Sequence, residues 1–129
     1  PLVGGAGAAD WQDPQIKINK LPIFLEINLS GEPTKHGFKP EEIDHAISTI
    51  KQFSNLTIKG LMTMPPLVKN PEENRAIFQQ LRKIADSYNL PPTSYNLKVS
   101  MGTSSDWKIA LEENADVIRV GSTIFSNHP

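Results

Sequence analysis

The chain contains no cysteine, which excludes disulfide bonds, thiolate metal ligands and a cysteine nucleophile. It has no apolar run near the roughly 20 residues of a membrane-spanning helix, and no signal-peptide pattern. An excess of one charge is also missing: 13 basic and 14 acidic residues leave a net charge of −1. Such a balance gives no electrostatic reason to bind nucleic acid or an acidic membrane. We therefore expect a cytoplasmic protein that binds neither.

The 129 residues, 38% of them hydrophobic, are enough for one domain with a sizeable core. Residues 1–20 begin with a run of small residues and include Asp13-Pro14, which is typical of a turn. We expect residues 1–20 to be a poorly ordered linker or leader, and residues 21–129 to form the folded domain.

Apolar segments rich in β-branched residues alternate with amphipathic segments along the domain. The first kind predicts strands at residues 23–29, 56–64, 97–100 and 117–120. The second predicts three helices, of which one opens at Lys39-Pro40, one opens at Asn70-Pro71 and one covers residues 107–114. The expected buried positions are Ile43, Ala46, Ile47, Ile50 and Phe53 in the first helix, and Ile77, Leu81, Ile84 and Tyr88 in the second.

This alternation predicts an α/β fold of parallel strands joined by right-handed helical crossovers. Along the first strand, Phe24, Glu26 and Asn28 should share one face, and the intervening apolar residues should share the other. Periodicity alone leaves two architectures open, an open sheet and half of a (β/α)8 barrel.

Two of the predicted strands end in small hydroxylated residues and glycine, which is typical of loops that hold an anion. The first such loop begins at Ser100 and Gly102, and the second contains Gly121 and Ser122. Glycine lets the backbone approach a phosphate closely, and hydroxyl and N–H groups can donate to it. We predict that these four residues bind one phosphorylated ligand. The alternative is that Ser104 or Ser105 merely caps the third helix.

The amino-acid sequence of these loops resembles the closing segment of the pyridoxal phosphate homeostasis proteins, which are single-domain relatives of the alanine racemase barrel. Residues 25–32, 35–38 and 59–65 resemble the same family's fifth and sixth strands. The resemblance implies the C-terminal half of a TIM-type (β/α)8 barrel. It also implies pyridoxal 5′-phosphate as cofactor, and a role in binding and buffering it inside the cell without committed catalysis.

In that family the lysine that bonds to the cofactor lies on the first barrel strand, so the resemblance implies a fragment that lacks this lysine. Two other functions stay open. The chain could be part of a racemase or decarboxylase built on the same barrel. It could instead be a half-barrel scaffold that associates with itself, or with the missing N-terminal half, without a cofactor.

Arg119 is the sharpest candidate residue, because alternation turns it toward the barrel interior and a buried guanidinium needs a partner. The resemblance implies that this partner is the pyridine nitrogen of the cofactor, and the alternative is an ion pair with Glu26. Met62 could pack on the ring or simply fill the core, and Asn28 could support the ligand or anchor its own loop. Lys35 could reach an aldehyde, but we interpret it as a surface lysine. No two histidines have metal-ligand spacing, and we expect no metal.

Overall fold

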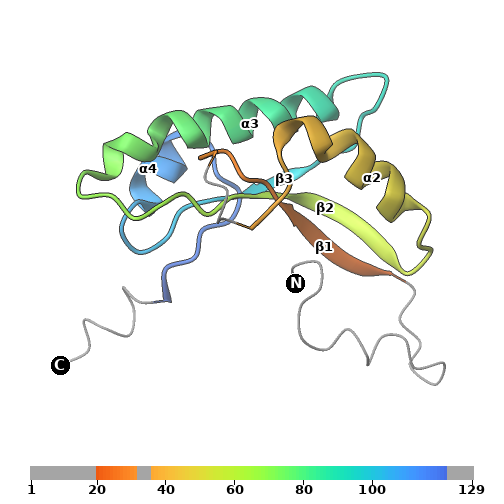
Figure 1. Cartoon of the computed structure of the whole chain (residues 1–129), viewed down its shortest axis with the longest axis horizontal. Helices are drawn as coiled ribbons and strands as arrows, with labels where there is room; N and C mark the ends of the chain where they lie inside the picture. The colour runs from red at the N-terminus through yellow and green to blue at the C-terminus, as the bar shows by residue number, and fades with distance from the viewer. Residues whose placement is uncertain (1–19, 32–35, 122–129) are drawn as a thin grey trace.

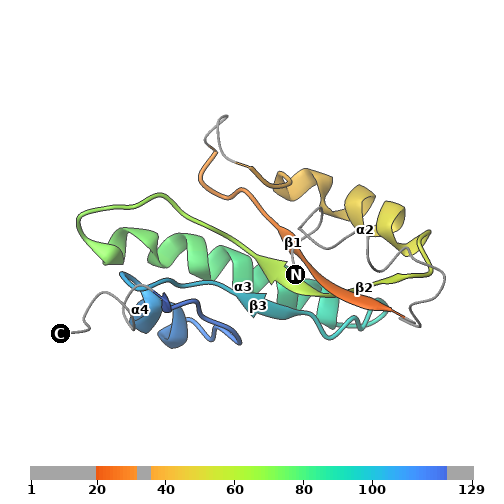
Figure 2. The same ribbon diagram turned by 90° about the horizontal axis from the view of Figure 1, so that it is seen from below.

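The computed structural model describes residues 20–31 and 36–121, and within them a parallel sheet carries its helices on one face. The elements are β1 (Leu21–Glu26), η1 (Pro40–Glu42), α2 (Ile43–Lys51), β2 (Leu56–Met62), η2 (Pro71–Asn74), α3 (Arg75–Asn89), β3 (Lys98–Ser100) and α4 (Trp107–Glu112). The strands pair in the order β1-β2-β3. Helices α2 and α3 lie along one face (Figure 1), and seen from below no described helix crosses in front of the strands (Figure 2). The predicted parallel α/β class is therefore confirmed.

The alternation of β1 explains why only one face of the sheet carries helices. Ile23, Leu25 and Ile27 are each at most 2% exposed and face the core under the helices. Phe24 and Glu26 point to the opposite face, which we call the open face, and both are only partly buried. The predicted division of this strand between two faces is confirmed.

A bulge interrupts the pairing of β1 with β2. Ile23 is in register with Ile58, but the next residue, Phe24, is in register with Gly60. Lys59 is therefore the extra residue of β2, and the alternation of β2 starts again after it.

The predicted fourth strand, residues 117–120, is wrong in extent. A single parallel bridge joins Val117 to Ser100, and the chain continues only with a 2.9 Å hydrogen bond from Arg119 N to Gly102 O. Gly102 has a φ of +102°, which is left-handed backbone. That conformation ends the extended run of β3, so a longer ladder has no strand to pair with.

The predicted positions of the helices are confirmed, but some of the residues predicted to be buried on them are exposed. Asn70 caps the first turn as expected, since its side chain accepts from Glu72 N at 3.1 Å. Phe53 is 53% exposed rather than buried, because α2 ends two residues before it. The fully buried residues of α3 are Phe78, Leu81 and Ala85, whereas the predicted Ile77, Ile84 and Tyr88 lie partly exposed at the margin of that stripe.

Gly60 lets the three strands approach at the middle of the sheet, and this leads to a prediction for stability. A Cβ there would lie 2.2 Å from Lys98 O and 2.6 Å from Phe24 Cε2. Because a backbone carbonyl cannot move aside, Gly60→Ala should lower the free energy of unfolding by about 3 kcal/mol, measured by urea denaturation.

The matched control is Gly121→Ala, since nothing lies within 4 Å of a Cβ at that position. It should change the free energy of unfolding by less than about 0.5 kcal/mol. Equal losses in the two variants would contradict the close approach at Gly60.

Candidate functional site

The carboxyl ends of the strands bring three of the predicted site residues together on the open face. Glu26 is in register with Met62, and Met62 is in register with Ser100, so these residues form one row across the sheet. Arg119 reaches the same row, since its Nη1 lies 3.7 Å from Met62 Sδ. The structure thus collects Met62, Ser100 and Arg119, although they lie on separate segments.

The guanidinium of Arg119 is half-buried and only partly hydrogen-bonded. Its Nη2 donates to Thr63 O at 3.1 Å, and its contact with Met62 Sδ is a weak one. Its Nε is buried and has no partner in the described structure. Burial lowers the pKa of Arg119, and the carboxylates of Glu26 and Asp106 oppose this shift.

Glu26 does not form the ion pair considered as an alternative. Within the described residues, ion pairs form only at Arg75 and Arg82, both on α3, and no carboxylate lies within 4 Å of Arg119. Glu26 influences Arg119 through its field alone. The guanidinium, which lies against Met62, therefore keeps an unused N–H donor.

Gly102 sits where no other residue fits without strain. Besides its positive φ, a Cβ there would lie 2.7 Å from Ala110 Cβ and 3.2 Å from Trp107 Cα. The loop after β3 therefore packs directly under α4 while its backbone carbonyl receives Arg119 N. This contact joins the two predicted anion-binding loops.

A buried carboxylate, Asp106, holds the rest of this loop in place. Its Oδ1 accepts from Thr103 N at 2.7 Å and from Thr103 Oγ1 at 3.2 Å, and its Oδ2 accepts from Asn74 Nδ2 at 3.1 Å. The same Asn74 amide also donates to Pro66 O at 3.3 Å. Asp106 is only 5% exposed and Asn74 only 3%, so this pair joins the loops after β2 and β3 from within the protein.

Asp106 also corrects the predicted cap of α4. It occupies the N-cap position itself, in place of Ser104 or Ser105, and its side chain bonds back to Thr103. Sequence reasoning missed both Asp106 and Asn74 as site residues. The available signal was the carboxylate that closes a run of small hydroxylated residues.

Between these loops lies a cavity of about 520 Å³. The lining residues come from the loop after β2, the loop after β3 and the segment that follows: Met64, Pro65, Pro66, Leu67, Thr103, Ser104, Ser105, Asp106, Arg119 and Gly121. Only Asp106 and Arg119 are ionisable among them. The cavity is therefore a largely neutral site with one cationic side chain.

The remaining predicted residues lie in several environments. Asn28 Oδ1 accepts from Ser30 Oγ at 3.1 Å and from Gly31 N at 3.3 Å, so its amide oxygen anchors its own loop. Met62 and Ser100 are 1% and 7% exposed and do not line the cavity. Ser122 and Lys35 lie outside the described residues, as does the segment 1–19.

Two kinds of feature are absent from the described part of the chain. No group of three or more histidine and acidic side chains there could hold a metal ion. None of its helices has both the length and the apolar character needed to cross a membrane.

A parallel sheet with helices on one face defines the class as an α/β domain. The family model "Alanine racemase, N-terminal domain" matches residues 7–129, so the chain belongs to that family. The "Pyridoxal phosphate homeostasis protein" of Aquifex aeolicus is 36% identical over 106 residues, which cover 80% of this chain and 45% of that protein. The protein of the same name in Pseudomonas aeruginosa is 33% identical, over 81% of this chain and 44% of that protein.

Two solved structures are similar to this chain over about half of their own length. PipY of Synechococcus elongatus PCC7942 without PLP superposes with a TM-score of 0.69 at 32% identity, over 78% of this chain and 47% of PipY. The structure of PipY with PLP bound gives a TM-score of 0.67 at 31% identity, over 79% of this chain and 47% of PipY. The chain spans about half the length of the curated relatives it matches. The resemblance to the homeostasis proteins is confirmed.

The Asp106 network yields a prediction. Asp106→Ala should lower the free energy of unfolding by about 3 kcal/mol, because it leaves the buried Asn74 amide and Thr103 N–H without their charged acceptor. Urea denaturation measures the loss, and hydrogen exchange should increase at Thr103 N–H.

Ser105→Ala is the matched control, because Ser105 is exposed and its hydroxyl lies 3.4 Å from Thr103 Oγ1 in the same loop. It should cost less than about 0.5 kcal/mol. If Asp106→Ala is as mild as this control, the carboxylate does not hold the loop.

Proposed function

We propose that this chain supplies the phosphate and ring-nitrogen contacts of a pyridoxal 5′-phosphate site. The protein concerned would bind and buffer the cofactor without committed catalysis. The observation that carries the proposal is the half-buried guanidinium of Arg119, whose buried Nε has no partner in the described residues and which lines the cavity. The relatives named as homeostasis proteins, and PipY with PLP bound, support it.

The charge of Arg119 and the hydroxyl and backbone groups of the two loops support this proposal. The arginine would face the pyridine nitrogen, and Ser100 with the backbone of Gly102, Gly121 and Ser122 would hold the phosphate. Met62 would lie against the ring, and Asn28 would keep its loop in position. Gly102 has a positive φ and packs under α4, so glycine is the residue that lets the loop after β3 follow this path.

Arginine at the ring nitrogen accounts for the absence of a committed reaction in this proposal. Pyridoxal phosphate, when bound, supplies a ring that withdraws electrons from an attached amino acid, most strongly when its nitrogen is protonated. A guanidinium keeps its own proton, so it donates a hydrogen bond and leaves that nitrogen unprotonated. Asp106, the only other ionisable group among the described cavity residues, is engaged in three hydrogen bonds. No observation favours the racemase or decarboxylase alternative.

Pyridoxine 5′-phosphate tests these contacts, because it has the ring and the phosphate but no aldehyde. Calorimetric titration of the 129-residue chain should show saturable binding that is lost with pyridoxine, which lacks the phosphate. Arg119→Gln should weaken binding about ten- to a hundredfold, the effect of one charge-assisted hydrogen bond. Ser100→Ala should weaken it about three- to tenfold.

Lys83→Gln, on the exposed side of α3, is the control and should leave the affinity unchanged. The proposal fails if Arg119→Gln behaves like this control while the chain stays folded, or if pyridoxine binds as tightly as its phosphate.

We also propose that the described sheet is half of a (β/α)8 barrel whose interior is the open face. Helices on one face only, and relatives about twice as long, support this architecture. In the described structure β1 pairs with β2 alone over residues 21–25, and Val117 on the open face is 42% exposed. A free edge at β1 and an exposed apolar side chain at the opposite edge of the sheet favour pairing with a second half-barrel or with a second copy.

Sedimentation velocity across a concentration series tests this surface. The chain should associate, and Val117→Lys should shift it toward the monomer, because a charge on the open face opposes burial. Leu111→Lys is the matched control, since Leu111 is 46% exposed but lies on α4. A monomer at every concentration, or equal shifts in both variants, would argue against pairing through the open face.

A further inference from the structure

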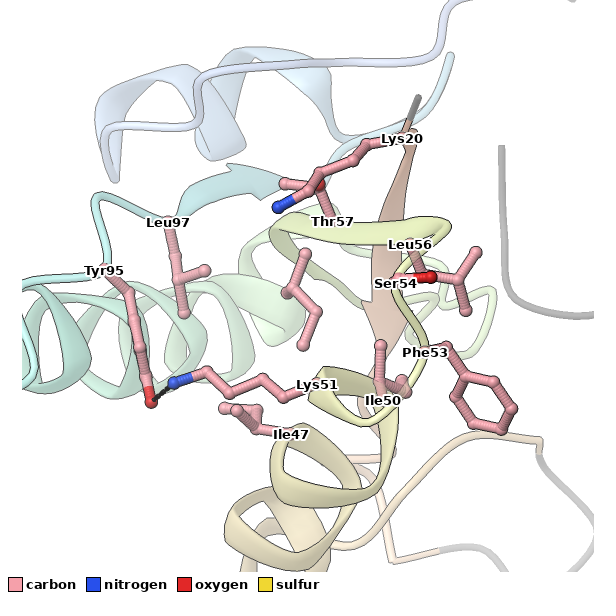
Figure 3. A pocket seen from close by; sticks show the side chains of 11 residues that line it. Lys20, Ile47, Ile50, Lys51, Phe53, Ser54, Leu56, Thr57, Tyr95 and Leu97 are labelled. Carbon is pink, nitrogen blue, oxygen red and sulfur yellow. Dashed lines mark hydrogen bonds between the residues drawn. The ribbon is translucent and has the colours of Figure 1, made fainter. Parts of the chain in front are cut away.

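A second cavity, of about 330 Å³, lies at the opposite end of the strands from Arg119. Lys20, directly before β1, and Leu56 and Thr57, at the start of β2, belong to its lining (Figure 3). Strand β3 begins only opposite Gly60, so the first part of β2 has β1 on one side and no described strand on the other, and the cavity lies on that second side. Its volume is at the lower end of the roughly 300–1,000 Å³ typical of small-molecule sites.

We propose that this cavity binds a small amphiphilic carboxylate, that is, an anionic group carrying a short apolar tail. The proposal is independent of the cofactor site, because the two cavities share no lining residue. The tail, the charge and the carboxylate are each matched by a separate feature of the cavity.

Apolar side chains from three segments form the body of the cavity. Ile47 and Ile50 come from α2, Leu56 and Ile58 from β2, and Leu97 from the segment before β3. Figure 3 shows the side chains of Ile47 and Leu97 converging on the same space from opposite walls, whereas Phe53 points away from it. A branched or straight hydrocarbon of a few carbons suits this lining, because it removes apolar surface on both sides from water.

The charged groups of the cavity are all cationic. Lys20 and Lys51 contribute two ammonium groups, and the lining contains no acidic residue. No carboxylate of the described chain is paired with either lysine. Lys51 donates to the hydroxyl of Tyr95 and lies 4.1 Å from the centroid of its ring, which fixes its ammonium group at the wall. Two uncompensated cations beside an apolar space select an anionic head group.

The hydroxyl of Thr57 identifies where that head group would bind. Its Oγ1 is buried and has no hydrogen-bond partner within the described residues, an arrangement that native proteins rarely leave unfilled. Figure 3 shows the ammonium group of Lys20 beside Thr57. A carboxylate oxygen that enters beside the Lys20 ammonium group would accept from it, and the Thr57 side chain would rotate from the open face to donate to the same oxygen. A phosphate fits less well, because this end of the sheet offers one hydroxyl and an apolar wall rather than an array of N–H donors.

Octanoate is the test ligand, and octylamine, with the same tail and the opposite charge, is its control. Calorimetric titration of the full chain should show saturable binding of octanoate and none of octylamine. Lys20→Gln and Lys51→Gln should each weaken octanoate binding about tenfold or more, whereas Lys83→Gln on α3 should not change it.

Thr57→Val separates ligand binding from folding. It should weaken octanoate binding about three- to tenfold and leave the melting temperature unchanged or higher, because a buried hydroxyl without a partner is removed. The proposal is overturned if octanoate does not saturate, or if octylamine binds equally well. It is also overturned if the variants at Lys20, Lys51 and Thr57 all keep the affinity of Lys83→Gln.

Discussion

The carboxylate of Asp106 is the constraint on which the carboxyl edge of this sheet depends. It is buried, and an isolated buried charge is strongly unfavourable, so its acceptor capacity has to be used. Thr103 and Asn74 use it from two different loops. Because Asn74 also donates to Pro66 O, one side chain fixes the spacing of the walls that enclose the larger cavity. The position of Arg119 opposite that wall follows from its backbone bond to Gly102.

Two glycines set the shape of the sheet in complementary ways. Gly60 removes a side chain from the middle of the open face, so that the Phe24 ring and the Lys98 carbonyl both approach β2. Gly102 changes the direction of the chain with a positive φ and so ends β3. The first allows the strands to come together, and the second prevents the sheet from continuing beside residues 117–120.

Most of the fold was predictable because it follows from local periodicity. The division of Ile23 and Leu25 from Phe24 and Glu26 follows from alternation, and the cap at Asn70 follows from side-chain chemistry. The length of the fourth strand was not predictable from its own apolar residues, because the backbone conformation of Gly102 decides it. Phe53 is exposed because α2 ends at Lys51, and the sequence pattern does not locate a helix end to within one turn.

The site was predictable where the strand ends dictate it and unpredictable where distant side chains meet. Ser100 and Met62 adjoin because their strands are in register, and alternation placed Arg119 on the same face. The partners of that arginine, Thr63 O and a methionine sulfur, follow only from three-dimensional packing. Asn74 and Asp106 are 32 residues apart, and no periodic pattern connects them.

The bulge at Lys59 has a consequence for how β2 can change in evolution. Thr57 is in register with Pro22 and Met62 with Glu26, so both turn to the open face although their positions differ by five, an odd number. Deleting Lys59, or inserting one residue near it, would exchange the two faces for one half of β2 relative to the other. The hydroxyl at one end of the strand and the sulfur at the other stay on a common face only while the residue count between them keeps its parity.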